Sequence, residues 1–131
     1  LDYSNLVTQD TMIIADPEQM KRVINNIISN SVKYMDKPKG KIDIRLLDEV
    51  DSVRIEIEDN GKGIAAKDLP LIFERFYRTD ASRNSSQGGS GIGLSIVKKI
   101  IEDHGGYIWA TSKEGEGTCM HFVIRKYQGH E

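Results

Sequence analysis

The spacing of the hydrophobic residues changes along this chain, and the changes limit the folds it can adopt. Between residues 20 and 35 apolar residues recur at helical spacing, namely Met20, Val23, Ile24, Ile27, Ile28 and Met35. From 42 to 46 and from 53 to 57 they alternate with polar residues, as in strands with one buried face. A second helical run covers 94–101, and two more strand-like runs cover 107–111 and 118–124. Helices and strands must therefore share one core.

Local signals mark where these elements begin and end. Asp16 can cap the first helix, Pro17 suits its first position and Gln19 completes a capping box. Pro38 and Gly40 predict the end of that helix nearby. We expect a hairpin linked at 48–51, a short helix at 69–76, a loop at 79–90, a helix from about 91 to 104 and a final hairpin around 113–117. The fold class is α+β: a two-layer α/β sandwich with a mixed, mostly antiparallel sheet and helices on one face.

Bulk properties exclude several classes of protein. The 131 residues suit one domain, and a net charge of −2 provides no basic field for nucleic acid. No run approaches the ~18 apolar residues of a membrane span, and no signal peptide follows Leu1. The single cysteine, Cys119, cannot form an internal disulfide and is expected to be a small buried side chain in a strand. The abrupt start at Leu1 indicates a piece of a longer protein.

Three segments carry residues that suit a nucleotide pocket. Asn26 and Asn30 lie one turn apart on the first helix, and their amide oxygens suit Mg²⁺, although asparagines can also merely decorate a solvated edge. The segment DNGKG at 59–63 can be an ordinary turn, but a carboxylate from Asp59 facing the helices could also accept the adenine amino proton. The segment GGSGIGL at 88–94 can be a hinge or an anion site at a helix start, and it fits neither the P-loop nor the dinucleotide pattern.

With these residues the chain resembles sensor histidine kinases of the GHKL superfamily. NIISNSVKY at 26–34 looks like their N box, DNGKGI at 59–64 like the first glycine box and FERFYR at 73–78 like the F box. GSGIGL at 89–94 resembles the second glycine box and GEGT at 115–118 the last one. The resemblance covers about residues 12–125 of the single domain expected over 1–131. It implies a Bergerat-type sandwich that binds ATP and Mg²⁺.

The resemblance also implies roles for individual residues. Asn30 would be the principal metal ligand and Asn26 its partner, while Lys33 would touch phosphate and Arg78 would face the γ-phosphate. Tyr34 would pack on adenine, and Asp59 would bind its amino group. The remaining residues implied at the base and the phosphate chain are Gly61, Gly63, Ile64, Gly89, Gly91, Ile92, Gly93, Leu94 and Thr118.

The residue at position 26 and the positions of the three histidines indicate which reactions this chain can catalyse. ATPases of the superfamily carry glutamate where this chain has Asn26, and an amide cannot act as a general base for water. His104 is expected in the core or at a helix end, His121 in a structural role and His130 in the tail, so that none of the three fits a phosphoacceptor. Trp109 is expected in the core. The upstream dimerisation and phosphoacceptor part is therefore expected to be missing, so that the chain binds ATP without autophosphorylation.

The expected function is that of the catalytic domain of a two-component sensor histidine kinase. Its partners would be its own dimerisation and phosphoacceptor domain and a response regulator receiver domain, with no nucleic acid and no direct membrane contact by this domain. The resemblance implies a cytoplasmic domain of a homodimeric, membrane-anchored parent. Two alternatives stay open: a protein-serine kinase of the anti-sigma type, against which the F box argues, and a non-enzymatic nucleotide-binding interaction domain, against which the intact Asn30 and Asp59 argue.

Overall fold

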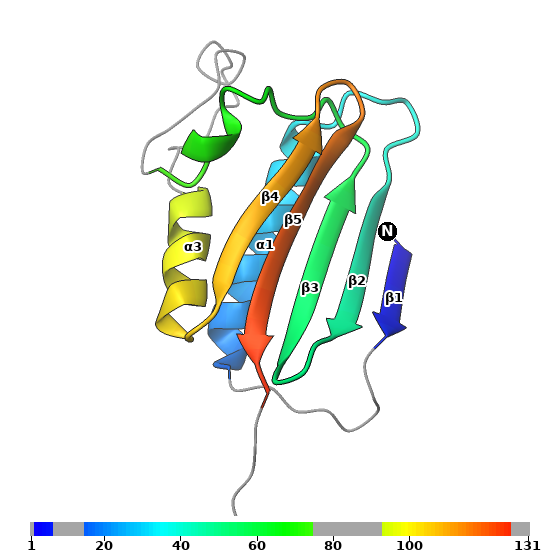
Figure 1. The fold of residues 1–131 in the computed structure, drawn as a ribbon. Coiled ribbons are helices and arrows are strands. Elements are labelled where there is room, and N and C mark those ends of the chain that lie inside the picture. Colours follow the sequence, from blue (N-terminus) through cyan, green and yellow to red (C-terminus); the bar gives the residue numbers. More distant parts are fainter. Residues whose placement is uncertain (1, 7–14, 75–92, 127–131) are drawn as a thin grey trace, which may run out of the picture.

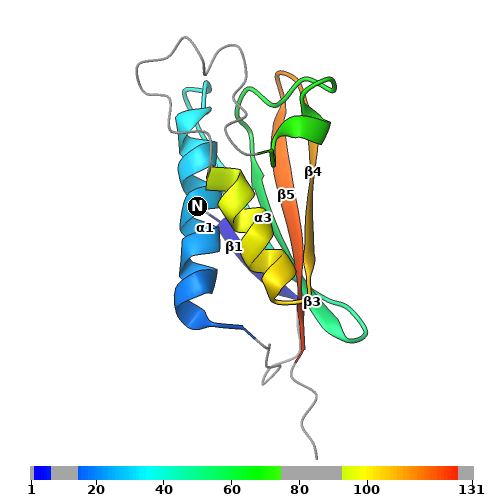
Figure 2. The ribbon, with the colours of Figure 1, turned by 90° about the vertical axis from the view of Figure 1, so that its left-hand side faces the viewer.

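A computed structural model describes residues 2–6, 15–74 and 93–126, and in these ranges two helices cover one face of a five-stranded sheet (Figures 1 and 2). In chain order the elements are β1 (Asp2–Leu6), α1 (Pro17–Lys33), β2 (Ile42–Asp48), β3 (Ser52–Asp59), the 3-10 turn η1 (Leu69–Leu71), α3 (Gly93–Asp103), β4 (Tyr107–Lys113) and β5 (Gly117–Arg125). The sheet order is β1-β2-β3-β5-β4. Only the β1–β2 pair among these is parallel, so the predicted mixed, mostly antiparallel sandwich is confirmed.

The first helix begins as predicted and ends earlier than predicted. The Asp16 carboxylate accepts hydrogen bonds from the backbone N–H groups of Glu18 (2.9 Å) and Gln19 (3.4 Å), and Pro17 is the first helical residue. The expected end near residues 38–40 is wrong, because the helix stops at Lys33. Tyr34 leaves helical geometry, and its carbonyl oxygen accepts the N–H of Lys62 at 3.2 Å. The helix therefore ends at a tertiary contact with the turn after β3, before Pro38 is reached.

The core lies between the two helices and the sheet. Its fully buried side chains come from both layers: Val23, Ile27, Ile57, Val97, Ile101, Phe122 and Ile124. Alternate residues of each strand face the helices, so β3 contributes positions 53, 55 and 57 and β5 contributes 120, 122 and 124. Continuing this alternation by one step places Asp59 and Thr118 on the same covered face, where β3 ends and β5 begins.

A histidine ties the two helices together at the other end of the core. His104 follows α3, and its Nδ1 lies 2.7 Å from the carbonyl oxygen of Ile100. Its Nε2 accepts the backbone N–H of Asp16 at 3.1 Å. The ring therefore joins the end of α3 to the start of α1, which confirms the predicted helix-end role of His104.

The side of the sheet away from α1 and α3, here called the open face, is covered by no helix of the described ranges (Figure 2). Trp109 lies on this face, so its expected core position is wrong. Its ring stacks on His121 at 4.9 Å and on Tyr107 at 5.4 Å. The alternation of β4 explains the placement, because Ile108 and Ala110 are the residues that pack against the core. Cys119 also points to this side and is buried, as predicted.

Other expectations are partly met. The helix expected at 69–76 is a 3-10 turn over Leu69–Leu71, and residues 75–76 lie outside the described ranges. The helix expected from about Gly91 is described from Gly93 onwards, and the loop expected at 79–90 is not among the described residues. No sequence signal predicted β1. None of the helices in the described ranges is long and apolar enough to cross a membrane.

Candidate functional site

The carboxylate of Asp59 is held in place by the chain around it. Its Oδ1 accepts the N–H of Gly61 at 2.9 Å and the N–H of Thr118 at 3.3 Å. The first bond closes the turn that follows β3, and the second reaches across to β5. No described residue donates a hydrogen bond to Oδ2. One oxygen therefore fixes the side chain, and the other is available to a donor that arrives from outside.

The end of α1 meets this turn through Tyr34. Besides the bond from Lys62 N to Tyr34 O, the ammonium groups of Lys33 and Lys62 lie 5.4 Å and 5.0 Å from the Tyr34 ring centroid. These are cation–π distances. A Cβ on Gly61 would come within 2.9 Å of Tyr34 O, which leaves this position to glycine. The helix end and the turn thus form one continuous surface beside Asp59.

The turn after β3 and the turn between β4 and β5 are far apart in the sequence but pack tightly against each other. Gly63 has φ of 75°, and a Cβ there would collide with the carbonyl oxygen of Lys113. Gly117 has φ of 132°, and a Cβ there would collide with the carbonyl oxygen of Asp59. The N–H of Gly115 also donates to Lys62 O at 2.7 Å. The segments that resemble the first and the last glycine boxes are therefore in direct contact.

Ser112 is a contributor that sequence reasoning missed. Its hydroxyl oxygen accepts the N–H of Ile64 at 2.8 Å, lies 2.9 Å from Thr118 Oγ1 and donates to Gly117 O at 2.7 Å. Ser112 therefore fastens the turn after β3 to the β4–β5 hairpin. The signal that could have found it is the alternation along β4, because Ser112 lies two residues after Ala110 and four after Ile108, and both of these face the covered side.

Asn26 and Asn30 are half-buried on α1, and no described residue forms a hydrogen bond with either side-chain amide. Successive turns of the helix place both amides on one edge, with Lys33 continuing it. Amide oxygens in this state can serve a hard cation that takes its remaining ligands from phosphate and water. These are the properties expected of the predicted metal ligands.

The described site residues lie at or near the ends of elements that meet at one end of the sandwich (Figure 1). The C-terminal end of α1, the N-terminal end of α3, the ends of β3 and β4 and the start of β5 all lie there. Gly93 begins α3 and is exposed, and Leu94 packs against the core. Of the predicted residues, Arg78, Gly89, Gly91 and Ile92 lie outside the described ranges.

A hollow of about 390 Å³ opens at this same end. Its walls come from the ends of three strands: Glu58, Asp59, Thr111, Ser112, Lys113, Glu116, Gly117, Thr118 and Cys119. Residues of α1 do not line it, and several of its walls belong to the open face. This hollow therefore borders Asp59 but not Asn30.

Comparison with known proteins gives consistent results. The family model described as "Histidine kinase-, DNA gyrase B-, and HSP90-like ATPase" matches residues 15–128. The sensor histidine kinase WalK of Bacillus subtilis is 40% identical over 123 residues, which is 92% of this chain and 20% of WalK. The chain thus spans about a fifth of the length of that relative.

Solved structures show the same architecture. A mycobacterial sensor histidine kinase, MprB, superposes with a TM-score of 0.80 at 30% identity, over 95% of this chain and 83% of that one. A structure of full-length ShkA in complex with AMPPNP has a TM-score of 0.78 at 25% identity, over 99% of this chain and 26% of ShkA.

Proposed function

This chain belongs to the histidine kinase-, DNA gyrase B- and HSP90-like ATPase family, as an ATP-binding catalytic domain of the sensor histidine kinase type, and we propose that it presents ATP to a histidine on another domain. The nucleotide would lie between α1, the start of α3 and the turn after β3. The observation that carries the proposal is the state of Asp59, whose Oδ1 is fixed by two backbone N–H groups while Oδ2 is free of described partners.

The free carboxylate oxygen suits adenine. The exocyclic amino group of adenine is a hydrogen-bond donor, whereas guanine has an acceptor at the corresponding position. Oδ2 of Asp59 can only accept, so it favours the first base and repels the second. Tyr34, Gly61, Gly63 and Thr118 surround this carboxylate or its turn, and we assign them to the base end of the site with Ile64.

The metal site would be built on α1. Asn30 is the proposed principal ligand of Mg²⁺ and Asn26 its partner, because both amides are half-buried and unengaged by described residues. When bound, Mg²⁺ would neutralise phosphate charge and orient the phosphate chain. Lys33 would add a cationic contact to phosphate. Arg78, Gly89, Gly91, Ile92, Gly93 and Leu94 remain proposed phosphate contacts from the sequence resemblance.

The chemistry would be positioning and charge neutralisation rather than activation of water. An amide at position 26 has no basic lone pair at neutral pH, so hydrolysis lacks a general base there. In the transfer the bond between the γ-phosphorus and its bridging oxygen breaks, a bond to an imidazole nitrogen forms, and ADP leaves. A site with these residues would hold ATP without hydrolysing it until the acceptor histidine arrives.

The acceptor and the relay partner lie outside this chain. We propose that the 131 residues form a single domain and that the whole protein, a homodimer, carries an upstream dimerisation and phosphoacceptor domain. A response regulator receiver domain would then take the phosphoryl group. We also propose a cytoplasmic position for this domain beneath a membrane-anchored parent.

Two measurements test this function. Calorimetry with Mg-ADP should give saturable binding, and no heat at about millimolar nucleotide would favour a scaffold without nucleotide. γ-Labelled ATP should leave the isolated chain unlabelled and should label a histidine-bearing helical hairpin of the parent when that hairpin is added. Acid-labile label supports phosphohistidine. Acid-stable label on serine would instead support the protein-serine kinase.

A further inference from the structure

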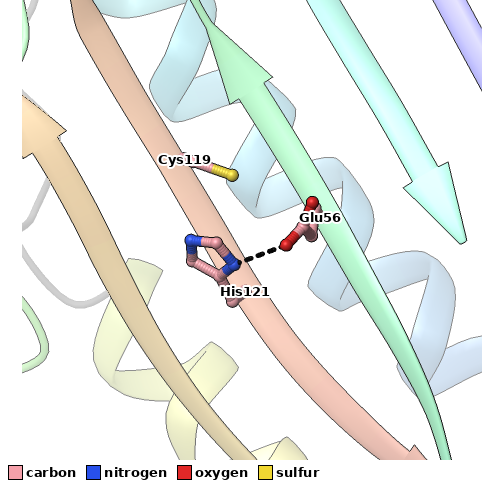
Figure 3. Close-up of side chains that lie close together, drawn as sticks. All are labelled: Glu56, Cys119 and His121. Atoms are coloured by element: carbon pink, nitrogen blue, oxygen red, sulfur yellow. Dashed lines mark hydrogen bonds and ion pairs between the residues drawn. The ribbon is translucent and has the colours of Figure 1, made fainter. Parts of the chain in front are cut away.

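Three side chains that commonly bind transition metals lie together on the open face. One ligand atom each from Glu56, Cys119 and His121 lies within 4.8 Å of the other two (Figure 3). Cys119 and His121 are two residues apart on β5 and so point to the same side, and Glu56 is paired directly with His121 across β3 and β5. In the searched part of the chain this is the one group of its kind.

The imidazole of His121 is already oriented as a ligand would need to be. Its Nδ1 lies 2.9 Å from Glu56 Oε2, and its Nε2 lies 2.9 Å from the hydroxyl oxygen of Thr111. Trp109 stacks on the ring at an interplanar angle of 3°. Metal-binding histidines typically have their second nitrogen held by such an outer partner, which fixes ring direction and tautomer. Thr111 supplies that partner from β4.

The carboxylate of Glu56 is held through its other oxygen. Arg45 Nε donates to Oε1 at 3.0 Å, and a second nitrogen of Arg45 forms an ion pair with Glu58 at 3.0 Å. Arg45 also approaches the Cys119 sulfur at 3.8 Å, but its charge is balanced by the two carboxylates. Arg54 Nε forms a longer ion pair with Oε2, at 3.4 Å and without a hydrogen bond, which a bound cation would have to displace. Oε2 therefore faces His121 and remains the oxygen a cation would take.

The cluster is sheltered but reachable. The side chains of Glu56 and His121 are 12% and 13% exposed, and Cys119 is buried. The hollow of about 390 Å³ includes Cys119, Glu58 and Thr111 among its walls, so it borders the cluster. Partial burial strengthens charge interactions, and the hollow provides an entry path for an ion.

We propose that Glu56, Cys119 and His121 form a binding site for a divalent transition metal ion of the zinc class, separate from the proposed Mg²⁺ site. One thiolate, one imidazole and one carboxylate are the ligand set that Zn²⁺ accepts, and three protein ligands leave the fourth position to water. Mg²⁺ and Ca²⁺ prefer oxygen ligands and are excluded by the sulfur and nitrogen. The site lies on the opposite face of the sheet from Asn30.

Binding requires a defined proton balance. Burial raises the pKa of Cys119 to about 12, so its sulfur carries a proton until a metal displaces it. With Nδ1 bound to the metal, a neutral His121 carries its proton on Nε2 and donates it to Thr111 Oγ1. One proton, from the thiol, leaves per metal ion bound. The ion, the thiolate and the Glu56 carboxylate together are then neutral.

The test is a titration of the chain with Co²⁺ alone, followed by displacement with Zn²⁺. We expect one Co²⁺ per chain, a thiolate-to-cobalt charge-transfer band and its loss when Zn²⁺ is added. Zn²⁺ should also raise the unfolding temperature. Cys119→Ser should abolish the band. Thr111→Val should keep it but weaken affinity about 10- to 100-fold, as losses of outer partners do. His104→Gln, which alters a histidine at the helix ends far from the cluster, should leave the cobalt band and the affinity for Co²⁺ unchanged.

The proposal is overturned if stoichiometric Co²⁺ gives no charge-transfer band, or if the band survives Cys119→Ser. X-ray absorption of the zinc-loaded wild-type chain covers the case in which a variant fails to fold. It should show one sulfur at about 2.3 Å and lighter ligands at about 2.0–2.1 Å. A first shell without sulfur would also refute the site.

Discussion

The two faces of the sheet achieve similar burial by opposite means. Ile55 and Glu56 are neighbours on β3 that point to opposite sides, yet they are 8% and 9% exposed. Ile55 is covered by the helix layer and belongs to the apolar core. Glu56 is covered by side chains of the sheet itself, with Arg45 and His121 as hydrogen-bond partners. A strand can therefore bury both of its faces when one of them pairs its charges.

The two kinds of burial respond to different conditions. The covered face depends on removal of apolar surface from water, which is not directional and varies little with pH. The open face depends on pairs with fixed geometry, and a buried charge whose partner is lost becomes costly. Substitutions and changes of pH should therefore affect the stability contributed by the two faces differently.

The largest expected effect is at Asp59, where the covered face ends. Asp59→Ala removes the proposed acceptor for the base, and we expect nucleotide affinity to fall at least about 100-fold, equal to about 2.7 kcal/mol. Calorimetry with Mg-ADP measures it, and circular dichroism checks that the variant is folded. Glu58→Ala is the matched control, because Glu58 is the preceding residue and points to the open face. Normal binding by Asp59→Ala would refute our assignment of the base end.

Glu56→Gln tests the charged face. At neutral pH we expect a loss of about 2 kcal/mol in the free energy of unfolding, because a nearly buried carboxylate loses its charge opposite Arg45. Burial, the largest influence, opposes ionisation of Glu56, but Arg45 and His121 outweigh it and lower its pKa below the ordinary value of 4.5.

The sign of the pH dependence follows from that lowered pKa. The stabilisation by Glu56 is present above the ordinary value and is lost as the pH falls through the folded value. In urea titrations the difference between wild type and Glu56→Gln should therefore shrink towards low pH. Glu18→Gln is the control, since Glu18 is exposed and its pair with Lys21 contributes little. A difference that stays constant with pH would contradict this account of the open face.

Adjacent leucines on β2 provide a matched pair for the two faces. Leu46 packs against the core, whereas Leu47 points the other way, and both are half-buried. Leu46→Ala should cost about 1.5–2 kcal/mol and Leu47→Ala less than about 1 kcal/mol, because only the first leaves space in a packed core. Urea unfolding of both variants measures the difference. Equal losses would show that the open face packs as tightly as the covered one.

The last prediction concerns the proposed metal ligand, where the expected effect is smaller than those at Asp59, Glu56 and Leu46. Asn30→Ala should weaken binding of Mg-ADP about 10-fold, or about 1.4 kcal/mol, and should leave binding of metal-free ADP nearly unchanged. Calorimetry with and without Mg²⁺ provides both numbers. Equal losses in the two titrations would assign Asn30 a structural role instead.

Local patterns predicted the covered face well. Alternation placed Ile57 and Phe122 in the core and put Asp59 on the helix side at a strand end, and the Asp16 cap follows from short-range chemistry. The failures come from contacts between distant segments. The hydrogen bond between Lys62 and Tyr34 lies where α1 ends earlier than predicted, and no sequence pattern near Tyr34 indicates this bond.

The open face was harder to predict. Apolar residues of β4 occur at both odd and even positions, so the sequence alone cannot decide whether Trp109 or Ile108 points towards the core. The pairing of β4 with β5 decides it. Ser112 was missed because a serine within a strand is ordinary, and its place on the same side as Ile108 and Ala110 is informative only once the pairing of β4 with β5 is known. The Glu56, Cys119 and His121 cluster needs the register of β3 against β5, which one sequence does not provide.

The contact between Gly63 and Lys113, and that between Gly117 and Asp59, has a mechanical consequence. Each turn occupies the volume that a side chain on the other would need, so neither can swing alone. We therefore expect a ligand that shifts Asp59 to shift the tip of the β4–β5 hairpin as well. Substitution of either glycine by a larger residue is therefore disfavoured, because the backbone of the opposite turn would have to move.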